Sequence, residues 1–448
     1  MEWYMYRYPN VSAAQLRRHK STATTTAVNA DLGGFLTTTT ATTSPSALLS
    51  PPGTLPAPLV SMEAARGSTS SSSTHSTGES TASLQTPFVI RHGRRYLRDL
   101  PYPLPCDLPE LQRQNLYTLL QTTIFGKALC SPQLKEKPPK RVLEVGCGSA
   151  YWSSLCHEYF ASLGIHDVEF VGLDIVPVAA DLNKQGINWR FVQHDLRKTP
   201  LPFQDGEFDI VMCKDLGLVI PVGLPSQSTL EEFMRITAIG GKLEFWDCDY
   251  GIRSLLPHPP PPPGQNAEDD EVAAETATFL ISPSTPFANA QNKYLGEVTT
   301  WLHDAIDNRK LYAMPCSRIL QMLLQEPETL SDVGYRRIAV PLGEMRWERD
   351  VDRGLRSLQR RDSELTTKTT AGEESSVLTE DQAALRRTAL TVVIQFVEGL
   401  EHLLKEVSGK NQEEWQRWWG WMMDDLVQNR GASSGECLEM GAWWATRI

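Results

Sequence analysis

The sequence has no concentrated positive charge and no long apolar segment. Its formal net charge is −11 over 448 residues, and no basic stretch is long enough to follow a phosphate backbone, so a nucleic-acid substrate is not expected. No run of about 18 apolar residues is present, and we therefore predict no transmembrane helix. These absences favour a cytoplasmic or nuclear protein.

Paired cysteines are also missing. No two of the eight cysteines form a C-x-x-C motif, and several lie in apolar segments typical of buried strands. We therefore predict reduced thiols, with neither a disulfide framework nor a metal site. The eight are Cys106, Cys130, Cys147, Cys156, Cys213, Cys248, Cys316 and Cys437.

Large apolar side chains are rare in residues 1–86, which are dominated by Ser, Thr, Ala and Pro. Such a segment cannot offset the entropy lost on ordering, so we predict a disordered N-terminal tail. Basic residues near the start (Arg7, Arg17, Arg18 and Lys20) resemble a mitochondrial transit peptide, but no amphipathic apolar face accompanies them. Mitochondrial import is therefore the less favoured alternative.

The most informative stretch runs from Lys140 to Trp152. Its first part is a short apolar run suited to a buried parallel strand, and the chain then turns at Gly146-Cys147-Gly148. Apolar residues at helical spacing follow from Ser149 onwards. The pattern predicts a strand, a glycine turn and a helix, a geometry that brings backbone N–H groups close to a ligand.

The spacing of this turn argues against a dinucleotide site. The third glycine of G-x-G-x-x-G would fall at Tyr151, whose ring would obstruct close packing of helix and strand. Glu144, two positions before the first glycine, would repel a pyrophosphate but suits the ammonium group of a methionine moiety. A nicotinamide-dependent reductase is therefore disfavoured. An ordinary turn that has lost its ligand remains an alternative.

The segment Leu143–Ala150 resembles the first motif of class I S-adenosyl-L-methionine (SAM)-dependent methyltransferases, with Ala150 where that motif often has a third glycine. The lead-in "GRRY…YPLPCD", which follows Phe88, looks like that of fungal LaeA/UMTA-like methyltransferases. Together the resemblance covers roughly Phe88–Tyr250. It implies SAM as cofactor, with contacts from Glu144, Gly146, Cys147 and Gly148.

Acidic residues follow the next two predicted strands. Asp174 ends a strand at residues 168–173, where a carboxylate can accept hydrogen bonds from both hydroxyls of a ribose. A third strand spans 187–195, and Asp195 stands where methyltransferases place the acceptor for the adenine amino group. The resemblance extends the predicted cofactor site to neighbours of these acids and to the end of the fourth strand, namely Ile175, His194, Leu196 and Lys214.

Three further acids lie at predicted carboxyl ends of strands and are candidates for a general base. Asp215 lies at the carboxyl end of the fourth strand, residues 208–215, while Asp247 and Asp249 follow the fifth, residues 242–246. A nitrogen or oxygen acceptor must lose a proton during methylation, which invites such a base. Ordinary loop or capping acids are the alternative for each.

The strand and helix signals predict an α/β fold, a Rossmann-like doubly wound sheet. We divide the chain into the tail (1–86), a lead-in with a helix from about Pro109 to Leu129 (87–130), a SAM-binding core (131–256), a Pro-rich acidic linker (257–275) and a C-terminal part (276–448). The methyltransferase resemblance implies seven strands, closed by 333–342 and 437–448, with helices inserted between this pair. Residues 364–376 are predicted to form a polar loop.

Two local predictions concern the helices. Ser228-Thr-Leu-Glu231 has the pattern of a capping box that opens a helix, and Thr379 caps one that runs through Val407. A helix opened by Asn411 carries an unusually dense aromatic and Met surface, which could be core or part of an acceptor pocket. Its large residues are Trp415, Trp418, Trp419, Trp421, Met422 and Met423.

These features predict a SAM-dependent methyltransferase with an unidentified acceptor, either a small molecule or a protein. The alternative is a non-catalytic subunit that keeps the SAM fold as a regulatory or interaction platform. A protein partner could bind the tail or the linker, the latter through its polyproline run.

Overall fold

The computed structural model describes residues 87–132, 138–262, 267–350 and 376–448. The tail predicted to be disordered and nearly all of the predicted polar loop lie outside these ranges. The described residues belong to one compact unit. Among them, no helix is long and apolar enough to cross a membrane.

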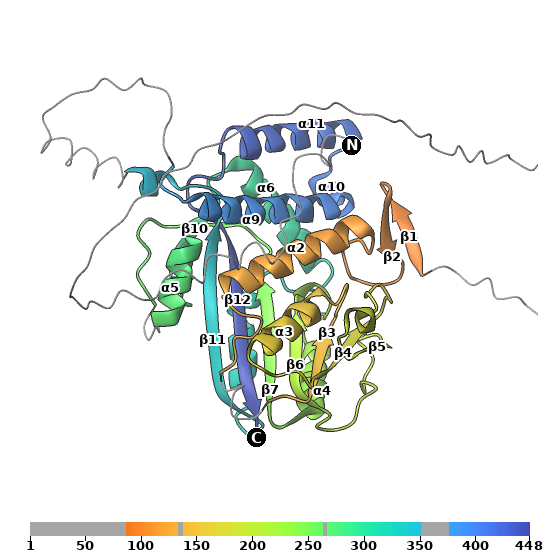
Figure 1. The fold of residues 1–448 in the computed structure, drawn as a ribbon. Coiled ribbons are helices and arrows are strands. Elements are labelled where there is room, and N and C mark those ends of the chain that lie inside the picture. The colour runs from red at the N-terminus through yellow and green to blue at the C-terminus, as the bar shows by residue number, and fades with distance from the viewer. Residues whose placement is uncertain (1–86, 133–137, 263–266, 351–375) are drawn as a thin grey trace, which may run out of the picture. The chain divides into compact units, whose positions relative to one another are not determined.

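A ten-stranded sheet forms the centre of the described chain (Figure 1). Its parallel strands lie in the order β5-β4-β3-β6-β7, and β12 then enters antiparallel between β7 and β11. These seven strands confirm the predicted doubly wound sheet and its closing pair. They are β3 Arg141–Val145, β4 Glu169–Asp174, β5 Trp189–Gln193, β6 Phe208–Lys214, β7 Thr237–Cys248, β11 Leu330–Pro341 and β12 Glu436–Arg447.

Short strands extend this sheet and a separate hairpin precedes it. β8 (Arg253–Leu255) pairs with β12 and β10 (Phe287–Asn289), while β9 (Phe279–Ile281) pairs with β11. The hairpin of β1 (Phe88–Arg91) and β2 (Arg94–Leu97) stands apart from the sheet. It leads through the loop 98–107 into the first long helix of the described chain.

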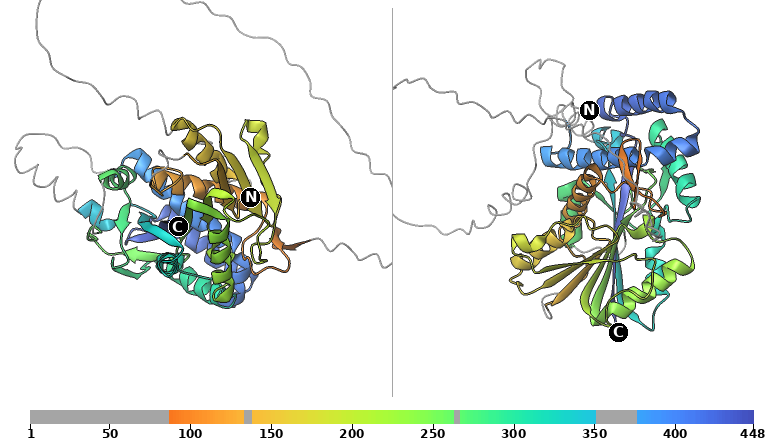
Figure 2. Two further views of the ribbon diagram at one scale, coloured as in Figure 1. Left: turned by 90° about the horizontal axis from the view of Figure 1, so that it is seen from below. Right: turned by 90° about the vertical axis from the view of Figure 1, so that its right-hand side faces the viewer.

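Helices cover both faces of the sheet (Figure 2, right). The apolar core on one face includes residues of α2, α3, α6, α9, α10 and α11, and the core on the other face includes residues of α4 and α7. Of these helices, α9, α10 and α11 lie beyond the carboxyl ends of the parallel strands (Figure 1). Strand side chains alternate between these cores: Val142 belongs to the first, Leu143 and Val145 to the second. The helices are α2 Leu108–Ile124, α3 Tyr151–Ser162, α4 Leu224–Ile236, α5 Ala267–Thr276, α6 Lys293–Asp307, α7 Ile319–Leu324, α9 Glu380–Gly399, α10 Glu401–Ser408 and α11 Gln412–Met423.

Several predicted boundaries are wrong. The helix predicted to reach Leu129 ends at Ile124. Helix α4 begins at Leu224 after Gly223, because Pro225 in its first turn is preorganised for a helix start, so Ser228 lies inside the helix. The helix ends at Ile236 rather than at the glycine pair 240–241, and that pair lies in an irregular stretch where the pairing of β6 with β7 shifts register. The helix after Thr379 ends at Gly399, and α10 continues separately.

The predicted acidic linker is partly ordered. Its second half forms α5, whose first turn carries Glu268, Asp269 and Asp270. Negative charge is stabilising at a helix N-terminus. Asp269 also pairs with Arg336 of β11, which attaches the helix to the sheet. Residues 263–266 lie outside the described residues.

The aromatic helix α11 is part of the core. Trp415 and Trp418 are buried and pack against each other and against Trp301 of α6, with ring centroids 4.9–6.4 Å apart. The Trp418 indole N–H also donates to Glu297 at 2.7 Å. The dense aromatic surface noted in the sequence therefore packs against α6, and the hypothesis that this helix lines an acceptor pocket is corrected below.

Replacing Trp418 with Leu tests this packing. We expect Trp418→Leu to lower the free energy of unfolding by about 2 kcal/mol or more, since it leaves a cavity and removes the partner of Glu297. Trp421 on the same helix is 58% exposed, so the control Trp421→Leu should change stability by less than about 0.5 kcal/mol. Chemical denaturation measures both, and equal losses would contradict the assignment.

Candidate functional site

A pocket lies at the carboxyl edge of the parallel strands, where doubly wound sheets bind their ligands. It holds about 1530 Å³ of empty space, part of it open to solvent. One end of the pocket, next to the carboxyl ends of β3, β4, β5 and β6, carries most of its polar groups and is called the polar end. It contains all but four of the predicted site residues. The lining members are Gly146, Gly148, Asp174, Ile175, His194, Asp195, Leu196, Lys214 and Asp215.

The glycine turn has the backbone that its sequence predicts. Gly146 and Gly148 have φ values of +66° and +49°, in the left-handed region that side chains rarely adopt. Space is also restricted, because a Cβ on Gly148 would lie 3.0 Å from Oε1 of Gln114 in α2. Ser149 donates to Asn115 at 2.5 Å, so α2 is attached directly to the turn. Helix α2 therefore lies against the glycine turn and lines the pocket.

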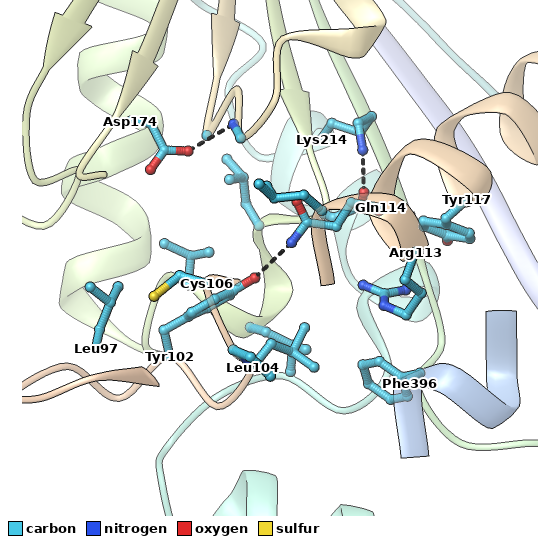
Figure 3. A pocket seen from close by; sticks show the side chains of 18 of the residues that line it. Leu97, Tyr102, Leu104, Cys106, Arg113, Gln114, Tyr117, Asp174, Lys214 and Phe396 are labelled. Atoms are coloured by element: carbon cyan, nitrogen blue, oxygen red, sulfur yellow. Dashed lines mark hydrogen bonds and ion pairs between the residues drawn. The ribbon is translucent and has the colours of Figure 1, made fainter. Parts of the chain in front are cut away.

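Asp174 sits next to this turn at the end of β4. Its carboxylate accepts from the N–H groups of Gly148, at 2.8 Å, and Val176, at 3.1 Å (Figure 3). Burial raises the pKa of this carboxyl, and the N–H groups act in the opposite direction. Because a carboxylate has more acceptor positions than these two bonds use, Asp174 can still accept from a ligand.

The residues after β5 form the next part of the lining. Asp195 lines the pocket, but its carboxylate is held by Arg197 in two hydrogen bonds of 2.8 and 2.9 Å. This partner lowers the pKa of Asp195. His194 contacts the carbonyl of Lys198 through Nε2, at 2.8 Å. The predicted bond from adenine to Asp195 would therefore share this carboxylate with Arg197.

Lys214 and Asp215 form an ion pair at the end of β6, with Nζ 2.5 Å from Oδ2 (Figure 3). Asp215 has φ +55°, an uncommon backbone conformation for a residue with a side chain. The Gln121 amide donates to its other oxygen at 3.3 Å. Asp215 is the one general-base candidate that lines the pocket.

Glu144 and Cys147, both predicted cofactor contacts, do not line the pocket. Glu144 shares the sheet face of Val142 and lies under α3, where it accepts from the N–H and hydroxyl of Ser153 at 3.1 and 2.6 Å. Cys147 is buried below the turn, and its sulfur would lie 2.8 Å from a Cβ at Gly172. The predicted cofactor contacts of Glu144 and Cys147 are therefore corrected. Both side chains pack inside the protein next to the glycine turn.

Asp247 and Asp249 do not line the pocket either. Asp247 accepts from the N–H groups of Gly217 and Cys248 and from the Tyr250 hydroxyl, at 2.8–2.9 Å. Burial, and then the charge of Asp215, raises its pKa to about 7. The residues of this segment that line the pocket are Cys248, Tyr250 and Ile252.

Asp249 belongs to a buried charge cluster. It accepts from the N–H of Cys316, and with Glu439 it pairs with Arg253, while Glu439 also pairs with Arg337. The cluster joins β7, β8, β11 and β12. One carboxylate oxygen each of Asp249 and Glu439 and the sulfur of Cys316 lie within 4.8 Å of one another. Both carboxylates, however, already form ion pairs with Arg253 or Arg337. Asp249 therefore has a role in the sheet rather than in the pocket.

The far end of the pocket was not predicted as a site. It is lined by the loop 98–107, α2 and α9, including Tyr102, Gln114, Tyr117 and Phe396 (Figure 3). No residue of α11 lines it, which corrects the acceptor-pocket hypothesis for that helix. The only local signal in the sequence was the apolar side of α2. The approach of α9, more than 200 residues after the glycine turn, leaves no local pattern.

Comparison with known proteins identifies a methyltransferase domain. A family model described as "Methyltransferase domain" matches residues 142–241, which include the glycine turn and the first five parallel strands up to the middle of β7. The match covers 100 of 448 residues. Among curated proteins, none matches the sequence. The sheet and this match agree on a methyltransferase-like fold.

Solved structures with detectable likeness include methyltransferases. Phosphoethanolamine N-methyltransferase 2 of Haemonchus contortus, solved with phosphomonomethylethanolamine and S-adenosylhomocysteine, is 13% identical, with 76% of this chain and 58% of that chain covered and a TM-score of 0.31. The YcgJ protein of Bacillus subtilis is 14% identical (74% and 97% covered, TM-score 0.31). A putative methyltransferase of Bacillus halodurans is 17% identical (73% and 97%, TM-score 0.31). At such TM-scores these likenesses do not bear on function.

The position of Glu144 generates a pH-dependent prediction. Burial raises the pKa of this carboxyl from 4.5 to about 7. Because the folded state then binds the proton more tightly than the unfolded state, the stability that this group contributes is present below about pH 4.5 and is lost as pH rises toward 7.

Glu144→Gln keeps an acceptor for Ser153 and removes the titration. We expect Glu144→Gln to increase the free energy of unfolding by about 1–3 kcal/mol more at pH 8 than at pH 5. The control Glu231→Gln changes an exposed glutamate of α4 and should show no such difference. Urea denaturation at both pH values measures it, and a pH-independent effect of Glu144→Gln would contradict the buried carboxyl.

Proposed function

We propose that the chain is a SAM-dependent methyltransferase and that its pocket holds SAM at the polar end. The observation that carries the proposal is the combination of the left-handed glycine turn with Asp174 in one pocket, within the segment that matches a methyltransferase domain. The residues present fit the cofactor: Gly146 and Gly148 line the pocket without a side chain, and Asp174 keeps acceptor positions unused.

Each part of the polar end has a task in this proposal. Asp174 accepts from the ribose hydroxyls, and the backbone at Gly146 and Gly148 allows close approach of the ligand. The strip from His194 to Leu196 lies along the base. When bound, SAM supplies a methyl group made electrophilic by its sulfonium. The protein's contribution is to orient the acceptor and to exclude water.

Asp215 is the proposed proton acceptor. It is the candidate base whose side chain reaches the pocket lining, and Lys214 and Gln121 fix its two oxygens. An acceptor hydroxyl or amine that gains a methyl group loses its proton, which a carboxylate at this place can take. The lead-in sequence supports a finer assignment, to the fungal LaeA/UMTA-like methyltransferases, and this rests on sequence resemblance alone.

Asp174→Ala tests the cofactor site. Loss of a charged acceptor for ribose is worth about 1.5–3 kcal/mol, so the dissociation constant of S-adenosylhomocysteine should rise by roughly 10- to 100-fold. Asp205→Ala is the matched control, because Asp205 is an exposed acid that does not line the pocket. Isothermal titration measures both, with circular dichroism to verify folding.

Unchanged affinity in folded Asp174→Ala would remove Asp174 from the site. Transfer of a radiolabelled methyl group from SAM to components of a cell extract then separates an enzyme from a non-catalytic platform. Binding of SAM without any transfer would favour the platform.

A further inference from the structure

The far half of the pocket is an apolar chamber made by segments outside the methyltransferase-domain match. Its walls come from the loop 98–107, from α2 and from α9, with Tyr250 at its inner side. Four residues of α9 line it: Val392, Val393, Phe396 and Val397. Phe396 stacks on Tyr250, with ring centroids 5.8 Å apart and an interplanar angle of 18°. We call this region, from Leu97 to Tyr117 on one side and from Val392 to Val397 on the other, the apolar chamber.

The charge that the chamber contains is already compensated. Arg113 is buried and donates two hydrogen bonds, of 2.9 and 2.7 Å, to Glu110. Its guanidinium lies 5.4 Å from the centre of the Phe396 ring. At the boundary with the polar end, Lys214 and Asp215 pair with each other.

The pairing of Arg113 with Glu110 and of Lys214 with Asp215 disfavours a charged ligand in the chamber. A carboxylate or phosphate that enters the chamber would meet no free cation among the described lining residues, and an ammonium would meet no free anion there. Desolvating such an ion without a partner is costly. The chamber therefore favours an uncharged, largely apolar molecule.

One polar group in the chamber wall remains unused. Tyr117 is only 4% exposed, and its hydroxyl forms no hydrogen bond of ordinary geometry with any described residue. The thiol of Cys248 interacts with this hydroxyl, but a thiol is a weak partner. A buried hydroxyl without a partner costs free energy, and a ligand that supplies one removes this cost.

Tyr117 stands beside the proposed base. Nζ of Lys214 lies 6.0 Å from the centre of the Tyr117 ring and 2.5 Å from the Asp215 carboxylate. Figure 3 shows Tyr117, Lys214 and Arg113 together on one side of the pocket. A group bound by the Tyr117 hydroxyl is therefore close to the boundary at which the two halves of the pocket meet.

We propose that the apolar chamber binds the methyl acceptor, and that this acceptor is an uncharged, largely apolar molecule with a hydroxyl group that hydrogen-bonds to Tyr117. The inference rests on the proposed function. In the reaction the acceptor oxygen forms a bond to the methyl carbon as the bond from that carbon to sulfur breaks. The hydroxyl proton passes to Asp215, and the sulfonium becomes a neutral thioether.

Three probes of one size test the chamber in the full-length protein. 2-Naphthol is neutral and has a hydroxyl, 2-methylnaphthalene lacks it, and 2-naphthoate replaces it with a negative charge. Isothermal titration is done with and without S-adenosylhomocysteine. We expect 2-naphthol to bind most tightly; failure of 2-naphthol to bind, or tighter binding of 2-naphthoate, would overturn the inference.

Tyr117→Phe removes only the unused hydroxyl. We expect this substitution to weaken 2-naphthol binding by about three- to tenfold, the effect of a neutral hydrogen bond, and to leave 2-methylnaphthalene unchanged. The melting temperature should not fall, because the hydroxyl has no strong partner to lose. Tyr335→Phe, at a tyrosine 38% exposed outside the pocket lining, is the matched control. Equal 2-naphthol affinities in wild type and Tyr117→Phe would overturn the inference.

Val393→Phe tests the same chamber by volume. The larger side chain should weaken both neutral probes at least fivefold while leaving the affinity for S-adenosylhomocysteine unchanged, and Val377→Phe, at an exposed valine, is its control. Unaltered binding of both probes would place them elsewhere and overturn the inference. The two proposals fail separately: loss of S-adenosylhomocysteine binding with the probe pattern intact refutes the cofactor assignment, and the reverse refutes the chamber.

Discussion

The pairing of β12 between β7 and β11 is the constraint on which the described architecture depends. Backbone hydrogen bonds attach β12 to β7 from Met440 to Thr446 and to β11 along nearly its whole length. The buried cluster of Glu439 with Arg253 and Arg337 links β12 to β8 and to β11. Because β11 and β12 are fixed side by side, the segment between them starts and ends at the sheet. Helices α9, α10 and α11 must therefore pack within reach of its carboxyl edge.

This arrangement gives the pocket two ends of different character. The polar end is built by turns that directly follow β3, β4, β5 and β6, and its acids are held by N–H groups or by basic side chains. The apolar end is built by α2 and α9, whose ionised group Arg113 is neutralised by Glu110. Charges in the lining are thus satisfied inside the protein. Selectivity at the apolar end then depends on shape and on single polar groups.

The sequence predicts the parts of this site that local rules determine. A strand followed by glycines identifies the turn at 146–148, and the rule that ligands bind at carboxyl ends identifies Asp174 and Asp215. The same rule fails for Asp247 and Asp249, and the argument from the methionine ammonium group fails for Glu144. Strand side chains alternate between faces, and only the packed helices decide which face meets the pocket. Those helices could be found, but their placement could not: α9 follows the turn by more than 200 residues. The capping signal at Ser228 failed because Pro225 provides a stronger one nearby.

The origin of α9 has a consequence for how such a protein can diversify. The helix contributes a wall to the pocket but no strand to the sheet, and it forms none of the hydrogen bonds that hold the glycine turn or Asp174. Substitutions at Val392 or Phe396 therefore reshape one wall while the polar end keeps its geometry. Changes in ligand preference can accumulate in an inserted helix without a compensating change in the sheet. The two ends of the pocket are in this sense separately evolvable.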